Sequence, residues 1–283
     1  MDTMRNPSNY MHDQEPEIVE ENQNRQFWDR FPDYLKDFFI GVAALARFTF
    51  RFMGEAFRPP FEWKEMLNQA YKLGYRSLLL VGISGFIIGL VMTLQTRPTM
   101  KEFGAESWIP AMISISIIRE IGPVLTALIC AGKVGSGIGA ELGSMKVTEQ
   151  IDAMAVSGAK PINYLVVTRV LAITLMLPIL VFYTDAIAIF GSFIGMNIGG
   201  SSMNFTLFIN NSLLPVTFED IIPATIKSVF FGFAIGIVSC YKGYYSQGGT
   251  VGVGNAANSS VVISSLLIFI IDLMAVQLKE LFF

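Results

Sequence analysis

Charged side chains are scarce in this chain of 283 residues, of which Asp, Glu, Lys and Arg make up only 15%. An ordinary soluble domain carries about 25%. After residue 76 the shortage produces long runs without any charge, which argue against a soluble fold and indicate a lipid environment. The net charge of −3 is also far from the strongly basic surface that nucleic acid attracts, so we expect no nucleic-acid partner.

Histidine and cysteine are almost absent as well. His12 is the only histidine and stands in a polar segment, so a zinc site or a Ser-His-Asp triad has almost nothing to be built from. We therefore expect no metal, no catalytic residue and no enzymatic activity in this chain. Cys130 and Cys240 lie in apolar surroundings and are predicted to be free buried thiols.

A nucleotide-binding loop is missing too. The G-x-x-x-x-G-K-[ST] pattern places backbone amides around a phosphate, but here Gly132-Lys133 is followed by Val134. We expect the chain to hold no cofactor and to bind no ATP by itself.

The first 76 residues hold most of the charge. Residues 1–30 are acidic and polar, which predicts a disordered tail without a cleavable signal peptide. Residues 31–76 are interpreted as interfacial helices, because 33–57 combine aromatic and aliphatic residues at helical spacing with Lys36, Arg47 and Arg51. A core helix of a soluble N-terminal domain is the alternative, although nothing nearby supplies the rest of such a domain.

Residues 77–283 are interpreted as a membrane domain with five transmembrane helices. About 20 apolar residues are needed to span a bilayer as a helix. The apolar runs cover 77–96, 107–132, 162–200, 221–241 and 259–278. The third run is long and contains Pro178; one kinked helix is preferred over two short segments. The predicted fold is an all-α membrane protein with an N-terminal interfacial amphipathic helix.

Basic residues predict the orientation. Residues 31–76 hold seven Lys or Arg, and 133–160 hold three, so both should be cytoplasmic. Residues 201–220 have no basic residue and should face outward. Five spans then place the C-terminus outside, although Arg97 and Lys101 in the 97–106 loop oppose this assignment.

Glycines four residues apart recur along the membrane domain, which predicts close helix packing and suggests a subunit interface. They are Gly85 and Gly89; Gly135, Gly139 and Gly143; Gly191, Gly195 and Gly199; and Gly232 and Gly236.

Arg119 and Glu120 interrupt the second apolar run. Ionisable groups at membrane depth are costly and usually pair or face water. Adjacent helical residues diverge by about 100°, so these two need not pair with each other. They are either anchors at the membrane interface or a polar gate beside a substrate cavity.

A short helix is predicted between the second and third runs. It is formed by Thr148, Glu149, Gln150, Ile151, Asp152, Ala153 and Met154. Glu149 and Asp152 lie one turn apart and share a face, while Ile151 and Met154 offer an apolar contact. Such a helix at the cytoplasmic surface can dock into a groove on a partner.

Several strings in this region resemble the signature of MlaE-type permeases (the MlaE/YrbE family), and the resemblance covers residues 33–283. The strings are Ile118-Arg119-Glu120-Ile121-Gly122-Pro123, Gly132-Lys133-Val134-Gly135-Ser136, Ala140-Glu141, Met145, Thr148-Glu149-Gln150-Ile151-Asp152-Ala153-Met154, Ile226-Lys227-Ser228-Val229-Phe230, Gly243-Tyr244-Tyr245 and Gly252-Val253-Gly254.

The resemblance implies the membrane subunit of an ABC transporter in the bacterial inner membrane. Such a permease would form a homodimer with two cytoplasmic ATPase subunits, which bind the ATP. It would also work with an MCE-domain lipid-binding protein and a STAS-domain protein. The substrate would be phospholipid moved between inner and outer membranes, which maintains outer-membrane lipid asymmetry.

The resemblance also implies residue roles. Residues 148–154 would be the coupling helix that contacts the ATPase, and Arg119 and Glu120 would be a polar pair beside the lipid pocket. Apolar residues of the first, second and fifth spans would line that pocket.

Three rival functions stay open on the residues alone. An ion-gradient-driven secondary transporter of a hydrophobic substrate would use Asp185, Asp272 or Glu120, but the two halves of the sequence show no convincing repeat. An intramembrane enzyme would need a clustered nucleophile, base or metal ligands, and the acids are scattered. A structural assembly factor is the third.

Overall fold

The computed structural model describes residues 36, 38–56, 62–198 and 203–282, with side chains up to residue 278. The chain divides into two units, Met1–Arg51 and Phe52–Phe283. Residues 38–56 are helical, in agreement with the helix expected there, and Phe38, Phe39 and Phe50 are exposed along it. The predicted disordered tail lies outside the described residues.

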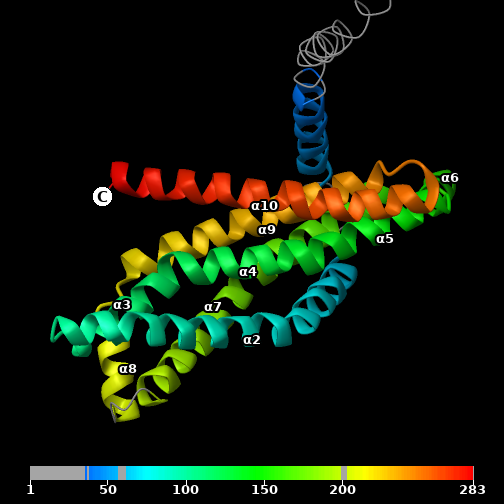
Figure 1. The fold of residues 1–283 in the computed structure, drawn as a ribbon. Helices are drawn as coiled ribbons and strands as arrows, with labels where there is room; N and C mark the ends of the chain where they lie inside the picture. The colour runs from blue at the N-terminus through cyan, green and yellow to red at the C-terminus, as the bar shows by residue number, and fades with distance from the viewer. Residues whose placement is uncertain (1–35, 37, 57–61, 199–202, 283) are drawn as a thin grey trace, which may run out of the picture. The chain divides into compact units, whose positions relative to one another are not determined.

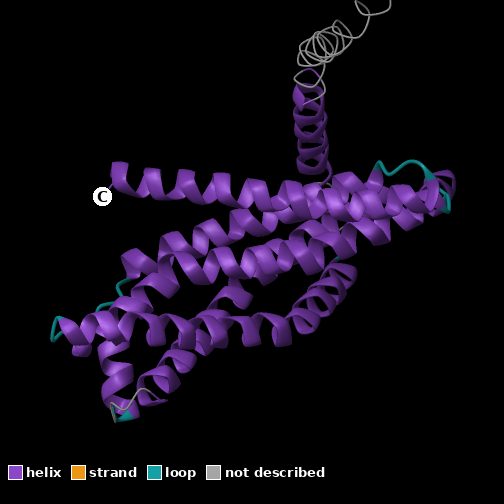
Figure 2. Ribbon diagram, viewed as in Figure 1, coloured by secondary structure: helices purple, strands orange, loops and turns teal. Residues whose placement is uncertain are grey.

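Five helices in the described residues are long and apolar enough to cross a membrane, which confirms the predicted all-α membrane fold (Figures 1 and 2). They are α2 (Trp63–Glu102), the composite helix Glu106–Val147, the composite helix Ile162–Ile198, α9 (Phe218–Tyr244) and α10 (Gly249–Phe282). The described residues contain no strand.

The first span is longer than its charge-free run. Helix α2 continues on both sides of 77–96, and Arg97, expected in a loop, lies inside the helix as a buried side chain. Its Nε lies 3.9 Å from Oε1 of Glu106. Arg97 therefore has an ion-pair partner within the fold and is not part of a loop between helices.

The second span is a continuous helix with two π-helical turns. It comprises α3 (Ile109–Ser116), the π turn Ile117–Ile121, α4 (Gly122–Cys130), the π turn Ala131–Gly135 and α5 (Ser136–Val147). The Gly-rich stretch after residue 132 is therefore helix up to Val147. Gly139 explains why: a Cβ there would come within 3.1 Å of the Ala256 carbonyl oxygen on α10, so the glycine permits close packing.

The third span is one helix, as preferred. A π turn at Ile162–Val167 continues into α7 (Thr168–Ile198), which contains Pro178. The polar segment that follows contains a helix that was not predicted, α8 (Phe205–Leu213). Asn204 caps its N-terminus, where the side chain accepts a hydrogen bond from the Thr206 N–H at 3.4 Å.

Close helix packing holds the Phe52–Phe283 unit together. Helix α7 packs against α2 on one side and α9 on another, and α10 packs against α9 and α5. A Cβ on Gly191 would collide with the Phe86 carbonyl oxygen of α2, and one on Gly232 would lie 2.9 Å from the Ile173 carbonyl oxygen of α7. These contacts confirm the close helix packing that was predicted, whereas Gly199 lies outside the described residues. Helix α6 lies at the opposite end of the unit from α3, α8 and the C-terminal end of α10 (Figure 1).

Candidate functional site

A π turn places the two charged residues of the second span. Pro123 has no N–H, so the Arg119 carbonyl lacks the donor that an α-helix would provide. The chain instead forms the π turn Ile117–Ile121, and the Gly122 N–H donates to the carbonyl of Ile117, five residues back. A π turn holds an extra residue and often marks a functional segment. Arg119 and Glu120 stand in this turn and point to different partners.

Arg119 pairs with α9. Its Nε donates to Oδ1 of Asp220 at 2.6 Å. The other carboxylate oxygen of Asp220 accepts from the N–H and hydroxyl of Thr217, at 3.1 and 3.0 Å, and closes the capping box that begins α9. Asp220 therefore caps the N-terminus of α9 and also links α9 to the second span.

Glu120 belongs to a second ionic group, centred on Lys227 of α9. The Lys227 ammonium donates to Oε2 of Glu120 at 2.6 Å and to Oδ1 of Asp272 of α10 at 2.8 Å. The Lys227 side chain is only 5% exposed, so its charge would be costly without these carboxylates. The second, fourth and fifth spans therefore meet at one cation.

An apolar cavity of about 590 Å³ opens beside this ionic group. It lies between α9 and α10, and Lys227 and Glu219 supply its charged lining. The other lining residues are Phe218, Ile222, Pro223, Ile226, Phe230, Ile271, Met274, Ala275 and Leu278. Its size and apolar walls suit a small amphiphile.

Of the two expected site residues, only Glu120 is linked to this cavity, and the link is indirect. Neither Arg119 nor Glu120 lines it, and Glu120 touches it only through Lys227. The walls come from the fourth and fifth spans, whereas the resemblance implied the first, second and fifth. Sequence reasoning gave Lys227 no role, although a signal was present: it is the only charge in residues 221–241. A lone cation within a membrane span needs a partner.

A short helix is present where one was predicted, with shifted bounds. Helix α6 spans Gln150–Val156, and Thr148 and Glu149 precede it, with Glu149 in the left-handed region at φ 60°. Glu149 and Asp152 are both exposed, but Asp152 is engaged by the Lys146 ammonium, at 2.8 Å from each carboxylate oxygen.

Ile151 departs from the prediction. It is 1% exposed and packs into the protein, so it anchors α6 and cannot offer a contact face to a partner. Of the expected residues, Thr148, Gln150 and Ala153 are exposed and Met154 is partly buried.

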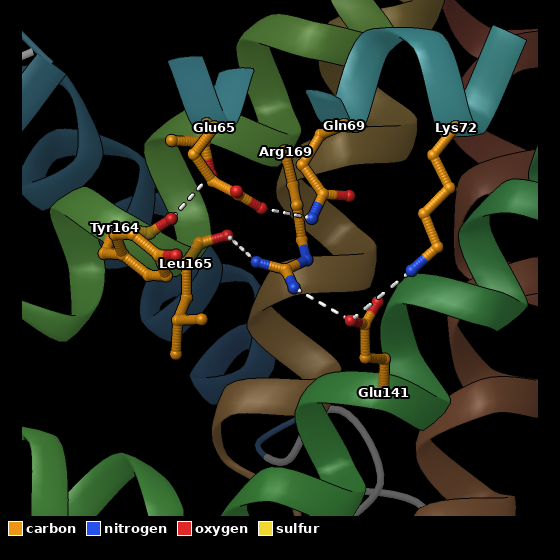
Figure 3. Close-up of polar contacts among 8 residues, drawn as sticks. Glu65, Gln69, Lys72, Glu141, Tyr164, Leu165 and Arg169 are labelled. Atoms are coloured by element: carbon orange, nitrogen blue, oxygen red, sulfur yellow. Dashed lines mark hydrogen bonds and ion pairs between the residues drawn. The ribbon is translucent and has the colours of Figure 1, made fainter. Parts of the chain in front are cut away.

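A second polar cluster joins α2, α5 and α7 (Figure 3). Arg169 is almost fully buried and donates to Glu141 at 3.0 Å and to the Leu165 carbonyl at 2.9 Å. Lys72 lies 4.0 Å from the same Glu141 carboxylate, and the Gln69 amide donates to a Glu65 oxygen at 2.7 Å. This cluster fixes the ends of three spans against one another.

Known proteins resemble this chain over most of its length. The model of the MlaE permease family matches residues 66–278. A probable ABC transporter permease protein of Rickettsia typhi is 38% identical over 239 residues, which are 84% of this chain and 91% of that protein. Probable ABC transporter permease proteins of Synechocystis and of Pyropia yezoensis are each 38% identical and cover 73% of this chain and 78% of their own length.

These matches include the ionic network, the apolar cavity and α6, and they agree with five apolar helices that cross a membrane. The chain is a multi-pass membrane protein that belongs to the MlaE family of ABC transporter permeases.

Proposed function

We propose that this permease moves phospholipids between the inner and outer membranes of a double-membraned cell and so maintains outer-membrane lipid asymmetry. The observation that carries the proposal is the cavity between α9 and α10, whose apolar walls end at the buried Lys227. Acyl chains fit such walls. The chain then resides in the bacterial inner membrane.

The energy comes from a separate cytoplasmic ATPase, and the permease itself is non-catalytic and holds no cofactor. Helix α6 is the contact for that ATPase, because it lies exposed at the surface. Its exposed side chains include Asp152 and Val156, the latter 90% exposed, and the exposed Glu149 directly precedes it. The span from Glu106 to Val147 connects the α6 end to Arg119 and Glu120. Closure of the ATPase therefore moves the residues that hold Lys227.

The working unit is a homodimer with further partners. Only 11% of the most apolar window of α10 is buried within the chain, which leaves a face for a second copy. An MCE-domain protein on the outer side receives or delivers lipid, and a STAS-domain protein accompanies the ATPase. In this orientation α6 is cytoplasmic and α8 faces outward.

Replacing Arg119 and Glu120 together with alanine tests the transport role. In the reconstituted complex we expect lipid transport and co-purified phospholipid to fall while the ATPase stays bound. Alanine at Lys101 and Glu102, an adjacent and exposed charged pair at the end of α2, is the control and should have no effect. Unchanged transport and bound lipid in the Arg119 and Glu120 variant would show that these residues are only anchors.

Charge reversal tests the α6 contact. Glu149→Lys with Asp152→Lys should release the ATPase during affinity purification, whereas Glu219→Lys at the other end of the bundle should not. Because Asp152 pairs with Lys146, the swap Lys146→Asp with Asp152→Lys keeps the internal pair. If the swap alone restores ATPase binding, α6 acts through its own stability and the docking role is lost.

One observation favours a second function, ion-gradient-driven transport of a hydrophobic substrate. Asp185 of α7 is 6% exposed, and its Oδ1 has no hydrogen-bond partner in the part of the chain that the structure describes. An unpaired acid inside a span is a candidate ion site. Transport in liposomes without any ATPase, abolished by Asp185→Asn, would establish this function instead of the first.

A further inference from the structure

A second cavity, of about 210 Å³, lies between α2 and the second span, far along the chain from the α9 and α10 residues of the first. Three of its lining residues are cations: Lys72, Arg76 and Lys133. The remaining lining residues are Gln69, Leu73, Ser77, Val134, Gly137, Ile138 and Glu141.

The charge of this cavity favours an anion. Glu141 is its only acid and is already engaged by Arg169 at 3.0 Å and approached by Lys72 at 4.0 Å (Figure 3). The Arg76 guanidinium has no ion-pair partner among the described residues, and both Arg76 and Lys133 are exposed. Two cations therefore face the opening without a matching carboxylate.

The sequence places the cavity at the boundary of the hydrocarbon layer. Arg76 is the last charge before the charge-free run 77–96, and Lys133 is the first charge after the charge-free residues 121–132. The Lys133 ammonium donates to the backbone carbonyl of Arg76, so the two boundaries lie at one level. Lipid phosphate groups lie at this level of a bilayer.

We propose that this cavity binds the phosphate group of an anionic lipid in the leaflet that surrounds the α6 end of the bundle. Basic pockets between transmembrane helices bind the headgroups of anionic lipids. Arg76 and Lys133 contact the phosphate, and the apolar Leu73, Val134 and Ile138 contact the first carbons of the acyl chains. Assigning the leaflet as cytoplasmic rests on the proposed function, but the binding does not.

Native mass spectrometry of the purified complex in detergent, titrated with phosphatidylglycerol, tests the site. We expect Arg76→Gln and Lys133→Gln to weaken binding by roughly fivefold each. Lys101→Gln, on the same helix outside the cavity, is the control and should leave the affinity unchanged. Equal affinity in all variants would overturn the proposal.

Gly137→Leu tests the cavity without changing its charge. No atom lies within 4 Å of a Cβ at Gly137, so the larger side chain can enter the space without displacing a helix. We expect it to abolish phosphatidylglycerol binding and leave the thermal unfolding temperature unchanged. Retained binding in this variant would contradict the site.

Two further titrations identify the ligand. Phosphatidylcholine should bind more weakly, because its headgroup has no net charge, and inorganic phosphate should not displace phosphatidylglycerol. Equal binding of both lipids, or displacement by phosphate alone, would overturn the assignment to an anionic lipid. Absence of phospholipid transport in the unaltered complex, together with retained phosphatidylglycerol binding, would count against the proposed function and not against this site.

Discussion

Lys227 is the residue on which the candidate site depends. Its ammonium is buried, and it bonds Glu120 of the second span and Asp272 of the fifth. Buried charges are tolerated when opposite charges surround them, and removing one partner leaves the others uncompensated. Lys227 therefore keeps two carboxylates together beside an apolar cavity, and its loss should affect stability and lipid binding at once.

We predict that Lys227→Met lowers the free energy of unfolding by about 2–3 kcal/mol, less than for a fully buried pair because Glu120 is 47% exposed. Thermal unfolding in detergent measures this effect, and bound phospholipid should fall in the same preparation. The triple variant Glu120→Gln, Lys227→Met and Asp272→Asn removes all three charges and should recover most of the stability. A triple variant as unstable as the single one would show that packing, not charge, is lost.

A second residue-scale prediction concerns helix approach. Gly191→Ala forces a Cβ against the Phe86 carbonyl oxygen, which belongs to the backbone and cannot rotate away. We expect a loss of about 1–3 kcal/mol, as for other overpacked sites. Gly137→Ala meets open space in α5 and should be neutral or stabilising by up to about 1 kcal/mol, because alanine favours helix. Equal unfolding temperatures for the two variants would contradict this packing.

Some of the site could be predicted from single residues, and the pairing could not. Arg119 and Glu120 were predictable because charges interrupt an apolar run. Their partners stand 101 and 107 residues away, and the pairing depends on the register that the π turn sets. A short stretch of sequence does not reveal that register. The sequence therefore indicated that Arg119 and Glu120 need partners, but it did not identify those partners.

At the scale of elements, helix existence was predictable and helix ends were not. Each span was visible as an apolar run, but α5 continues through the Gly-rich stretch because its glycines pack against α9 and α10. Tertiary contacts of that kind outweigh the weak helix propensity of glycine. Tertiary contacts also position α6, because the buried side chain of Ile151 fixes this helix against the rest of the chain without any partner protein.

We predict that Ile151→Ala detaches α6 from the bundle. Truncation of a buried isoleucine costs about 2–4 kcal/mol locally. ATPase activity of the reconstituted complex should lose its response to lipid, although no surface charge has changed. Val156→Ala, at a 90%-exposed position, should leave unfolding unaffected and alter only ATPase binding. If the two variants behave alike, Ile151 is not the anchor.

For the whole molecule, the main feature is the face of α10 that no other helix of the described residues covers. Its outward residues include Leu266, Phe269 and Leu273, which are all exposed in the single chain. Lipid alone can cover such a face. Because this face of α10 lies beside the cavity between α9 and α10, it also suits contact with a second copy of the chain.

We predict that Leu273→Cys forms disulfide-linked dimers in native membranes under mild oxidation. The natural Cys130 and Cys240 are both buried and should contribute little background. Ile179→Cys, on the exposed face of α7, serves as the lipid-facing comparison and should stay monomeric on non-reducing gels. Cross-linking at Ile179 but not at Leu273 would move the dimer interface to the other side of the bundle.

The unbroken helix Glu106–Val147 has a mechanical consequence. From Glu120 to its last residue it is roughly 40 Å long at 1.5 Å per residue. A rotation of the helix by about 5° around its end next to α6, at Val147, would move Arg119 and Glu120 sideways by about 3–4 Å. That displacement exceeds the 2.6 Å distances of the Arg119–Asp220 and Glu120–Lys227 hydrogen bonds. A small rotation of this helix is therefore enough to separate Glu120 from Lys227.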